Sequence, residues 1–104
     1  MKIYFLHSPE FEDSVKLEIT LCEMKEFIRL KNFQFEEVDA KSMYGTFLLK
    51  KFSIKKIPSL ILIEEMEESK SSYSLIAGNI QKAELELAIS NFVKTNIAGI
   101  TLPN

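Results

Sequence analysis

Residues 52–63 read Phe-Ser-Ile-Lys-Lys-Ile-Pro-Ser-Leu-Ile-Leu-Ile, and this stretch decides the fold. From Ile57 to Ile63 the side chains are almost continuously apolar, which is the pattern of a strand buried on both faces of a sheet. Pro58 stands at the entrance of that strand, where the missing backbone N–H is tolerated. A cis Ile57–Pro58 bond is one solution to the lost donor, since cis costs only about 0.5–1 kcal/mol before proline.

The residues around this strand predict three more strands and three helices from their apolar spacing. The predicted strands are Lys2–Leu6, Phe33–Val38 and Tyr73–Ala77, and the predicted helices are Val15–Lys31, Ser42–Phe52 and Gln81–Lys94. Ser14 or Asp13 is expected to cap the first helix, and Gly45 is expected to weaken the second. The charged, Ser-rich segment Glu64–Ser72 is expected to form the solvated tip of an antiparallel hairpin.

The order of these elements is strand, helix, strand, helix, strand, strand, helix, which predicts an α/β fold. Its sheet is expected to be mixed and four-stranded, with helices on both faces and a right-handed crossover between the first two parallel strands. A chain of 104 residues, 46% of them hydrophobic, has room for one core. We therefore expect a single domain over residues 1–94, followed by a C-terminal tail over residues 95–104.

Charge and cysteine content exclude several classes of function. The net charge of −2 is spread over interspersed lysines and glutamates, so no basic surface for nucleic acid or for an anionic membrane is expected. Cys22 and His7 are the single residues of their types, too few for a disulfide or a zinc site. With a single cysteine, a reducing cytoplasm is expected. The apolar start of the chain is too short for a signal peptide or a membrane span, so the protein is expected to stay where it is made.

Two segments resemble the thioredoxin superfamily. Residues 52–63 are similar to the stretch that leads into the family's cis-proline strand, in which Ile or Val precedes the proline and Thr or Ser follows it. Residues 75–85, Leu-Ile-Ala-Gly-Asn-Ile-Gln-Lys-Ala-Glu-Leu, resemble its closing strand and last helix. The resemblance covers residues 2–94 and is closer to the compact glutaredoxin form. It implies a thioredoxin fold whose backbone at Ile57 can bind an extended peptide or glutathione.

The cysteine pair of the redox members is absent. Their Cys-x-x-Cys opens the first helix, where this chain reads Ser-Pro-Glu-Phe-Glu-Asp-Ser over residues 8–14. One alignment places Phe11 and Ser14 at the cysteine positions, and a shift by one places Glu10 and Asp13 there. The carboxylates at the helix start are favoured by the helix dipole and would repel a thiolate or glutathione. No catalytic residue and no metal ligand is predicted; the expected binding residues are Glu10, Phe11, Glu12, Asp13, Ser14, Ile57 and Pro58.

These features predict a redox-inactive module that binds a protein or peptide through the cis-proline edge and needs no cofactor. Phe11 either anchors the partner or closes the pocket that the cysteines vacate. One alternative is a glutathione- or thiol-linked enzyme that uses Ser8 or Ser14 instead of cysteine. His7 is expected to be a surface or hydrogen-bonded residue rather than a general base.

A further alternative, a structural subunit, comes from the first helix, which carries two apolar stripes. One stripe contains Leu17, Leu21, Met24 and Ile28, and the other, nearly opposite, contains Val15, Ile19, Cys22 and Leu30. The first is expected to rest on the sheet. The second is expected to be covered by the third helix or by Ile97, Ile100 and Leu102 of the tail, or else by a second copy of the chain in a homodimer. Cys22 is accordingly expected to be a buried structural thiol.

Overall fold

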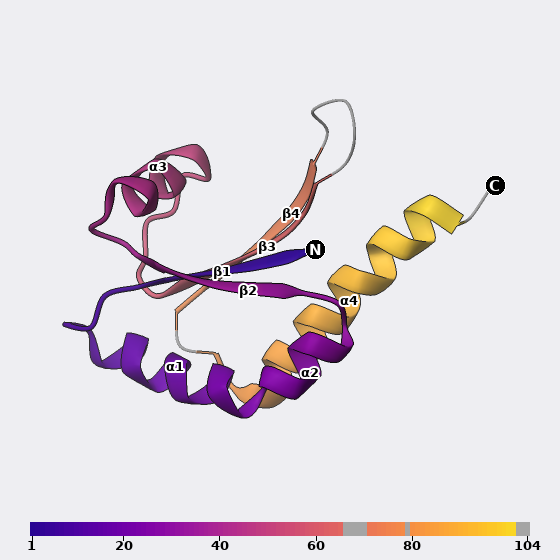
Figure 1. The fold of residues 1–104 in the computed structure, drawn as a ribbon, viewed down its shortest axis with the longest axis horizontal. Helices are drawn as coiled ribbons and strands as arrows, with labels where there is room; N and C mark the ends of the chain where they lie inside the picture. The colour runs from indigo at the N-terminus through magenta and orange to yellow at the C-terminus, as the bar shows by residue number, and fades with distance from the viewer. Residues whose placement is uncertain (66–70, 79, 102–104) are drawn as a thin grey trace.

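The computed structural model describes residues 1–65, 71–78 and 80–101 of the chain. Four strands and four helices are present in this part of the chain (Figure 1). Their bounds are β1 Lys2–His7, α1 Glu12–Glu23, α2 Lys25–Leu30, β2 Gln34–Asp39, α3 Met43–Lys51, β3 Ser59–Glu65, β4 Ser71–Ala77 and α4 Lys82–Thr101. Residues 66–70, which include most of the predicted hairpin tip, lie outside the described part.

The strands form one mixed sheet in the order β2-β1-β3-β4. β1 runs parallel to β2 and antiparallel to β3, and β3 runs antiparallel to β4. The predicted α/β fold with a mixed four-stranded sheet is therefore confirmed. β1 and β3 occupy the centre because their side chains are apolar on both faces, whereas β2 and β4 form the edges.

Helices cover both faces of the sheet, as predicted (Figure 1). α1, α2 and α4 lie on one face, where Leu17, Leu21 and Leu85 pack against Phe5 and Leu60. α3 lies on the other face, where its buried side chains join those of the alternate positions of β1 and β3; this second cluster contains Tyr4, Leu6, Leu48, Phe52, Ile61 and Ile63. Full burial of one such side chain contributes about 1.5–3 kcal/mol, so both layers are needed to stabilise the central strands.

The first helix differs from its prediction in two ways. It is two helices, because the chain changes direction at Met24, whose N–H is shared between the carbonyls of Thr20 and Leu21. The bend allows Leu21, Met24 and Ile28 all to face the curved sheet. The predicted cap is also wrong: α1 begins at Glu12 with Phe11 as its N-terminal cap, which supplies no side-chain hydrogen bond.

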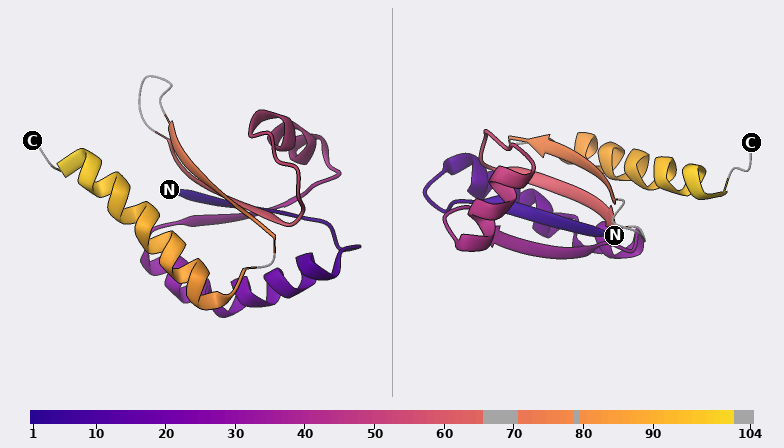
Figure 2. Two further views of the ribbon diagram at one scale, coloured as in Figure 1. Left: turned by 180° about the vertical axis from the view of Figure 1, so that it is seen from behind. Right: turned by 90° about the horizontal axis from the view of Figure 1, so that it is seen from above.

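The second apolar stripe of the first helical segment is exposed, which corrects the expectation that α4 covers it. Val15, Ile19 and Leu30 remain 44%, 59% and 66% accessible, and the Cys22 thiol is exposed instead of buried. α4 lies on the same face of the sheet as α1 and covers the sheet, not the outer surface of α1 (Figure 2). The side chains of Ile97, Ile100 and Leu102 lie outside the described residues.

The last helix is longer than predicted, since α4 continues beyond Lys94 to Thr101 and residues 95–101 are helical rather than a tail. Its C-terminal part projects past the sheet (Figure 2). Neither α4 nor any other helix in the described ranges combines the length and the apolar character that crossing a membrane requires.

Gly45 allows α3 to approach the end of β2 closely. The prediction that Gly45 weakens this helix does not include that packing role. A Cβ at this position would lie 2.1 Å from the backbone oxygen of Asp39 and 2.9 Å from the Cα of Ala40. Real Cβ atoms do not approach backbone atoms so closely, so α3 would have to move away from the sheet. The Ser42 hydroxyl accepts a hydrogen bond from the Gly45 N–H and caps the helix at the same place.

We therefore expect Gly45→Ala to destabilise the protein by about 1–3 kcal/mol, because overpacking against backbone outweighs the better helix propensity of alanine. Urea denaturation measures the free energy of unfolding. Thr46→Ala is the matched control, since Thr46 is exposed on the same helix and its replacement should change the stability by less than about 0.5 kcal/mol. A stabilised Gly45→Ala protein would show that propensity, and not close approach, governs this position.

Candidate functional site

The topology brings the start of α1 next to the start of β3. β1 and β3 are antiparallel, and Leu6 at the end of β1 is the register partner of Ser59 at the start of β3. The loop that leaves β1 towards α1 therefore meets the Ile57–Pro58 turn that enters β3. Together they form an open hollow of about 390 Å³, and its lining residues are Glu10, Phe11, Glu12, Asp13 and Ile57. Five of the seven predicted binding residues thus line one surface.

Phe11 holds the entrance to α1 and forms part of the hollow. Its N–H donates to the carbonyl of Ser8 at 3.0 Å, which closes a turn after β1, and its own carbonyl accepts from the N–H of Ser14 at 3.1 Å. The backbone of Phe11 is extended, so the helix starts only at the next residue. The aromatic side chain is 47% accessible. About half of its surface is therefore in contact with the protein and half is available to a ligand.

Ser14 and Pro58 lie behind the hollow and do not line it. Ser8 and Ser14 are each only 2% accessible, and the Ser14 hydroxyl accepts a hydrogen bond from the Ser8 N–H at 3.2 Å. Ser14 therefore joins the start of α1 to the end of β1, and neither serine presents its hydroxyl to a ligand in the hollow. The Ser8 hydroxyl is buried without a hydrogen-bond partner among the described residues.

The Ile57–Pro58 peptide bond is cis, and Pro58 is buried. The Pro58 carbonyl accepts a hydrogen bond from the N–H of Gly78 at 2.8 Å, which joins the start of β3 to the end of β4. Within the described part of the chain, the backbone N–H and carbonyl of Ile57 form no hydrogen bond. Ile57 therefore contributes to the hollow its apolar side chain and a backbone N–H and carbonyl that have no partner among the described residues.

The rim of the hollow is acidic. Glu10, Glu12 and Asp13 place three carboxylates at the N-terminus of α1, where the helix dipole favours negative charge. Lys41 pairs with Glu10, and Lys16 pairs with Glu12 at 3.3 Å. All four of these paired side chains are more than half exposed, so the pairs contribute little stability and can be exchanged for contacts with a ligand. Basic groups of a ligand therefore fit this rim.

Lys41, which no sequence pattern singles out, reaches Glu10 from the loop before α3 across 31 positions of the chain. No local pattern could have indicated this pair, because it depends on how α3 docks on the sheet.

Neither Cys22 nor His7 lines the hollow. Cys22 is exposed on α1 and lines a different pocket, between α1, α2 and β2. The His7 ring stacks on Phe5 with 4.9 Å between the centroids, and its Nε2 lies 3.9 Å from an oxygen of Glu37. The described residues contain no cluster of three side chains that could hold a metal ion.

The fold is similar to that of known thioredoxins. The thioredoxin of Thermus thermophilus superposes with a TM-score of 0.72 at 13% identity, over 88% of this chain and 72% of that one. The thioredoxin of Trichomonas vaginalis gives 0.68 at 15% identity, over 88% and 78% of the two chains. Mitochondrial thioredoxin 3 of Saccharomyces cerevisiae, in its oxidized form, gives 0.66 at 12% identity, over 86% and 76%.

No protein-family model matches the sequence, and no curated protein matches it. The likeness to the solved structures therefore shows a thioredoxin-like fold and nothing about activity.

Replacement of the two buried serines beside the hollow, Ser8 and Ser14, is expected to have different effects on stability. Ser14→Ala leaves the buried Ser8 N–H without an acceptor and should cost about 1–3 kcal/mol. Ser8→Ala removes a hydroxyl that has no described partner and should be neutral or stabilising. Urea denaturation of both variants measures the difference. Equal losses in the two variants would be incompatible with the Ser8–Ser14 hydrogen bond as the link between β1 and α1.

Proposed function

We propose that this chain, a protein with the thioredoxin-like fold, is a redox-inactive module that binds an extended segment of another protein in the hollow between Glu10–Asp13 and Ile57. The observation that carries the proposal is the unpaired backbone of Ile57, which lies beside the half-exposed ring of Phe11. A reducing cytoplasm is the compartment proposed for it, because the sequence has a single cysteine.

The cysteine content supports a binding function over disulfide exchange. Exchange within one chain needs a thiolate and a resolving thiol close together, and the sequence contains only Cys22. Cys22 lies about 12 Å along α1 from Ser14, at 1.5 Å per residue. It also lines a different pocket from the hollow. The residues of the hollow therefore offer hydrogen bonds, apolar contact and charge, but no nucleophilic sulfur.

The proposed ligand follows from the groups that the hollow presents. The backbone of Ile57 can pair with an extended peptide, in the way that strands add to unpaired backbone. Phe11 and Ile57 together favour an apolar side chain at the centre of the segment. The three carboxylates at the rim favour lysine or arginine on either side of it.

Phe11→Ala should weaken binding of the physiological partner by about tenfold or more, as expected for an aromatic anchor. Affinity capture from the source cell identifies the partner, and titration of the captured protein with both forms of the module measures the loss. Phe47→Ala is the matched control, because Phe47 is similarly exposed but lies on α3, which covers the opposite face of the sheet. Equal affinity of the two variants would show that the hollow is not the binding site.

Glutathione tests the enzymatic alternative. We expect no saturable binding in isothermal titration calorimetry, because the carboxylates of Glu10, Glu12 and Asp13 repel the two carboxylates of glutathione. Burial of Ser8 and Ser14 also removes the two hydroxyls that such an enzyme would use. Saturable heat that disappears in Ile57→Pro, which lacks the backbone N–H, would favour a glutathione-linked function instead.

Assembly through the first helix is the second candidate function, and one observation favours it. Val15 and Ile19, one turn apart on α1, and Leu30 at the end of α2 are exposed apolar side chains. Groups of exposed apolar side chains mark surfaces that associate with other chains. A homodimer through these side chains is compatible with peptide binding in the hollow, because none of the three lines the hollow.

A further inference from the structure

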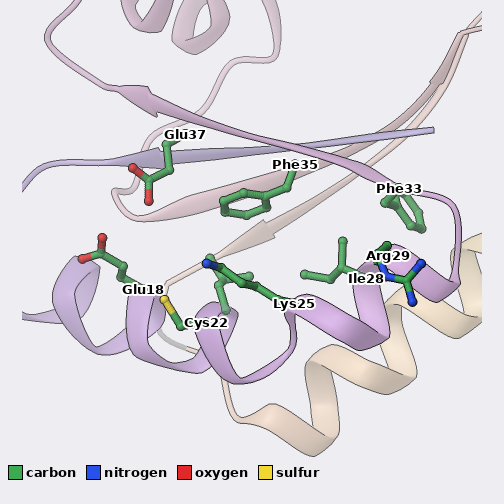
Figure 3. Close-up of a pocket in the computed structure, with 9 residues that line it drawn as sticks. Glu18, Cys22, Lys25, Ile28, Arg29, Phe33, Phe35 and Glu37 are labelled. Atoms are coloured by element: carbon green, nitrogen blue, oxygen red, sulfur yellow. The ribbon is translucent and has the colours of Figure 1, made fainter.

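A second pocket lies along the edge of the sheet, between α1 and α2 on one side and β2 on the other (Figure 3). Its volume is about 330 Å³, and it shares no residue with the hollow. Its apolar lining residues are Leu21, Ile28, Phe33 and Phe35, of which Ile28 and Phe33 lie at the end nearer Arg29 (Figure 3). Two carboxylates, those of Glu18 and Glu37, line the other end and project from α1 and β2 on the same side of the pocket (Figure 3).

The strand that borders this pocket has a free backbone edge. β2 is one of the two edge strands and pairs only with β1 among the described residues. The N–H of Gln34 donates to Met1 and the N–H of Ala40 donates to His7, each at 2.9 Å. In a parallel ladder, the backbone N–H and carbonyl groups of successive residues point alternately to the two sides of the strand. The backbone groups of even-numbered residues of β2 therefore point to β1, and those of odd-numbered residues point away from it. Phe35 and Glu37 therefore direct their N–H and carbonyl groups outward.

The same two residues carry the side chains that line the pocket. Phe35 and Glu37 both extend from β2 towards the helices (Figure 3). A strand that hydrogen-bonds to their backbone in antiparallel orientation places its own residues directly opposite them, with side chains on the same face. One added strand would thus use the free backbone and fill the pocket at once.

The lining determines which side chains fit at the two positions. Opposite Phe35 the wall is apolar, so an aromatic or large aliphatic side chain is favoured. At the peptide position opposite Glu37, the carboxylates of Glu37 and Glu18 favour a basic side chain. The ammonium group of Lys25 lies between these two carboxylates and balances only one of their charges. Arg29, at the apolar end, is already paired with Glu26.

A second copy of the chain does not fit this edge. Antiparallel pairing of β2 with its own copy would bring Glu36, Glu37 and Asp39 of both strands together, and β2 contains no basic residue. Like charges on neighbouring strands are destabilising. The acidic edge therefore excludes self-pairing and selects a basic partner.

We propose that the free edge of β2 is a second docking site, which takes an extended peptide segment of the pattern basic-x-apolar as an added antiparallel strand. Since the segment runs opposite to β2, its basic residue lies opposite Glu37 and its apolar residue two positions later lies opposite Phe35. This site is separate from the hollow and does not depend on the function proposed for it.

The direct test is fluorescence polarisation with a labelled peptide, Ser-Thr-Arg-Thr-Phe-Thr-Ser. Binding is expected for this peptide. A control peptide with Phe-Thr-Arg in place of Arg-Thr-Phe should bind at least about tenfold more weakly, because its ring then lies opposite Glu37 and its charge opposite Phe35. Glu37→Lys should weaken the Arg-Thr-Phe peptide by a similar factor and should bind the corresponding Glu-Thr-Phe peptide better than the wild type does. Glu36→Lys is the matched control, since it makes the same charge change on the opposite face of β2.

Hydrogen exchange followed by NMR tests the backbone pairing itself. The amides of Phe35 and Glu37 are expected to exchange quickly in the free protein and to become protected by about tenfold or more on saturation with the peptide. The amides of Gln34 and Glu36 face β1 and serve as the internal control. No binding, binding without this protection, or binding that Glu37→Lys does not weaken would each overturn the proposal.

Discussion

The burial of β3 on both faces is the constraint from which the other elements follow. Leu60 and Leu62 belong to the core beneath α1, α2 and α4, whereas Ile61 and Ile63 belong to the core beneath α3. A strand that is apolar on both sides needs a helical layer on each face and a neighbouring strand at each edge. β1 and β4 supply the neighbours, and the approach of α3 at Gly45 closes the second layer.

This arrangement leaves backbone N–H and carbonyl groups without a partner among the described residues at two places, the start of β3 and the outer edge of β2. Register pairing of β3 with β1 begins at Ser59, and the preceding Ile57 finds no backbone partner among the described residues beside the loop that starts α1. At the edge strand β2, the outward backbone groups of Phe35 and Glu37 likewise have no partner in the part of the chain that the structure describes. In both places an apolar side chain and carboxylates accompany the unpaired backbone. This shared combination underlies both proposals of a basic, extended peptide, although the two surfaces share no residue.

Much of the fold was predictable because its signals are local. The continuous apolar run of β3 and the helical spacing in α1 and α4 each reflect the burial of residues that are close in the chain. The errors lie where separate helices and strands interact. The chain bends at Met24 to follow the curved sheet, and Ser14 bonds to Ser8 instead of capping the helix.

The sequence by itself determined the apolar central strand, the absence of a second thiol and the acidic start of the first helix, because composition and spacing are properties of the chain alone. Only the tertiary structure decided which of two apolar stripes is covered, and with it the exposure of Cys22 and Ile19. It alone also joined Lys41 to Glu10 and left the edge of β2 open. These outcomes depend on which surfaces pack together, and residues that are remote in the chain make that choice.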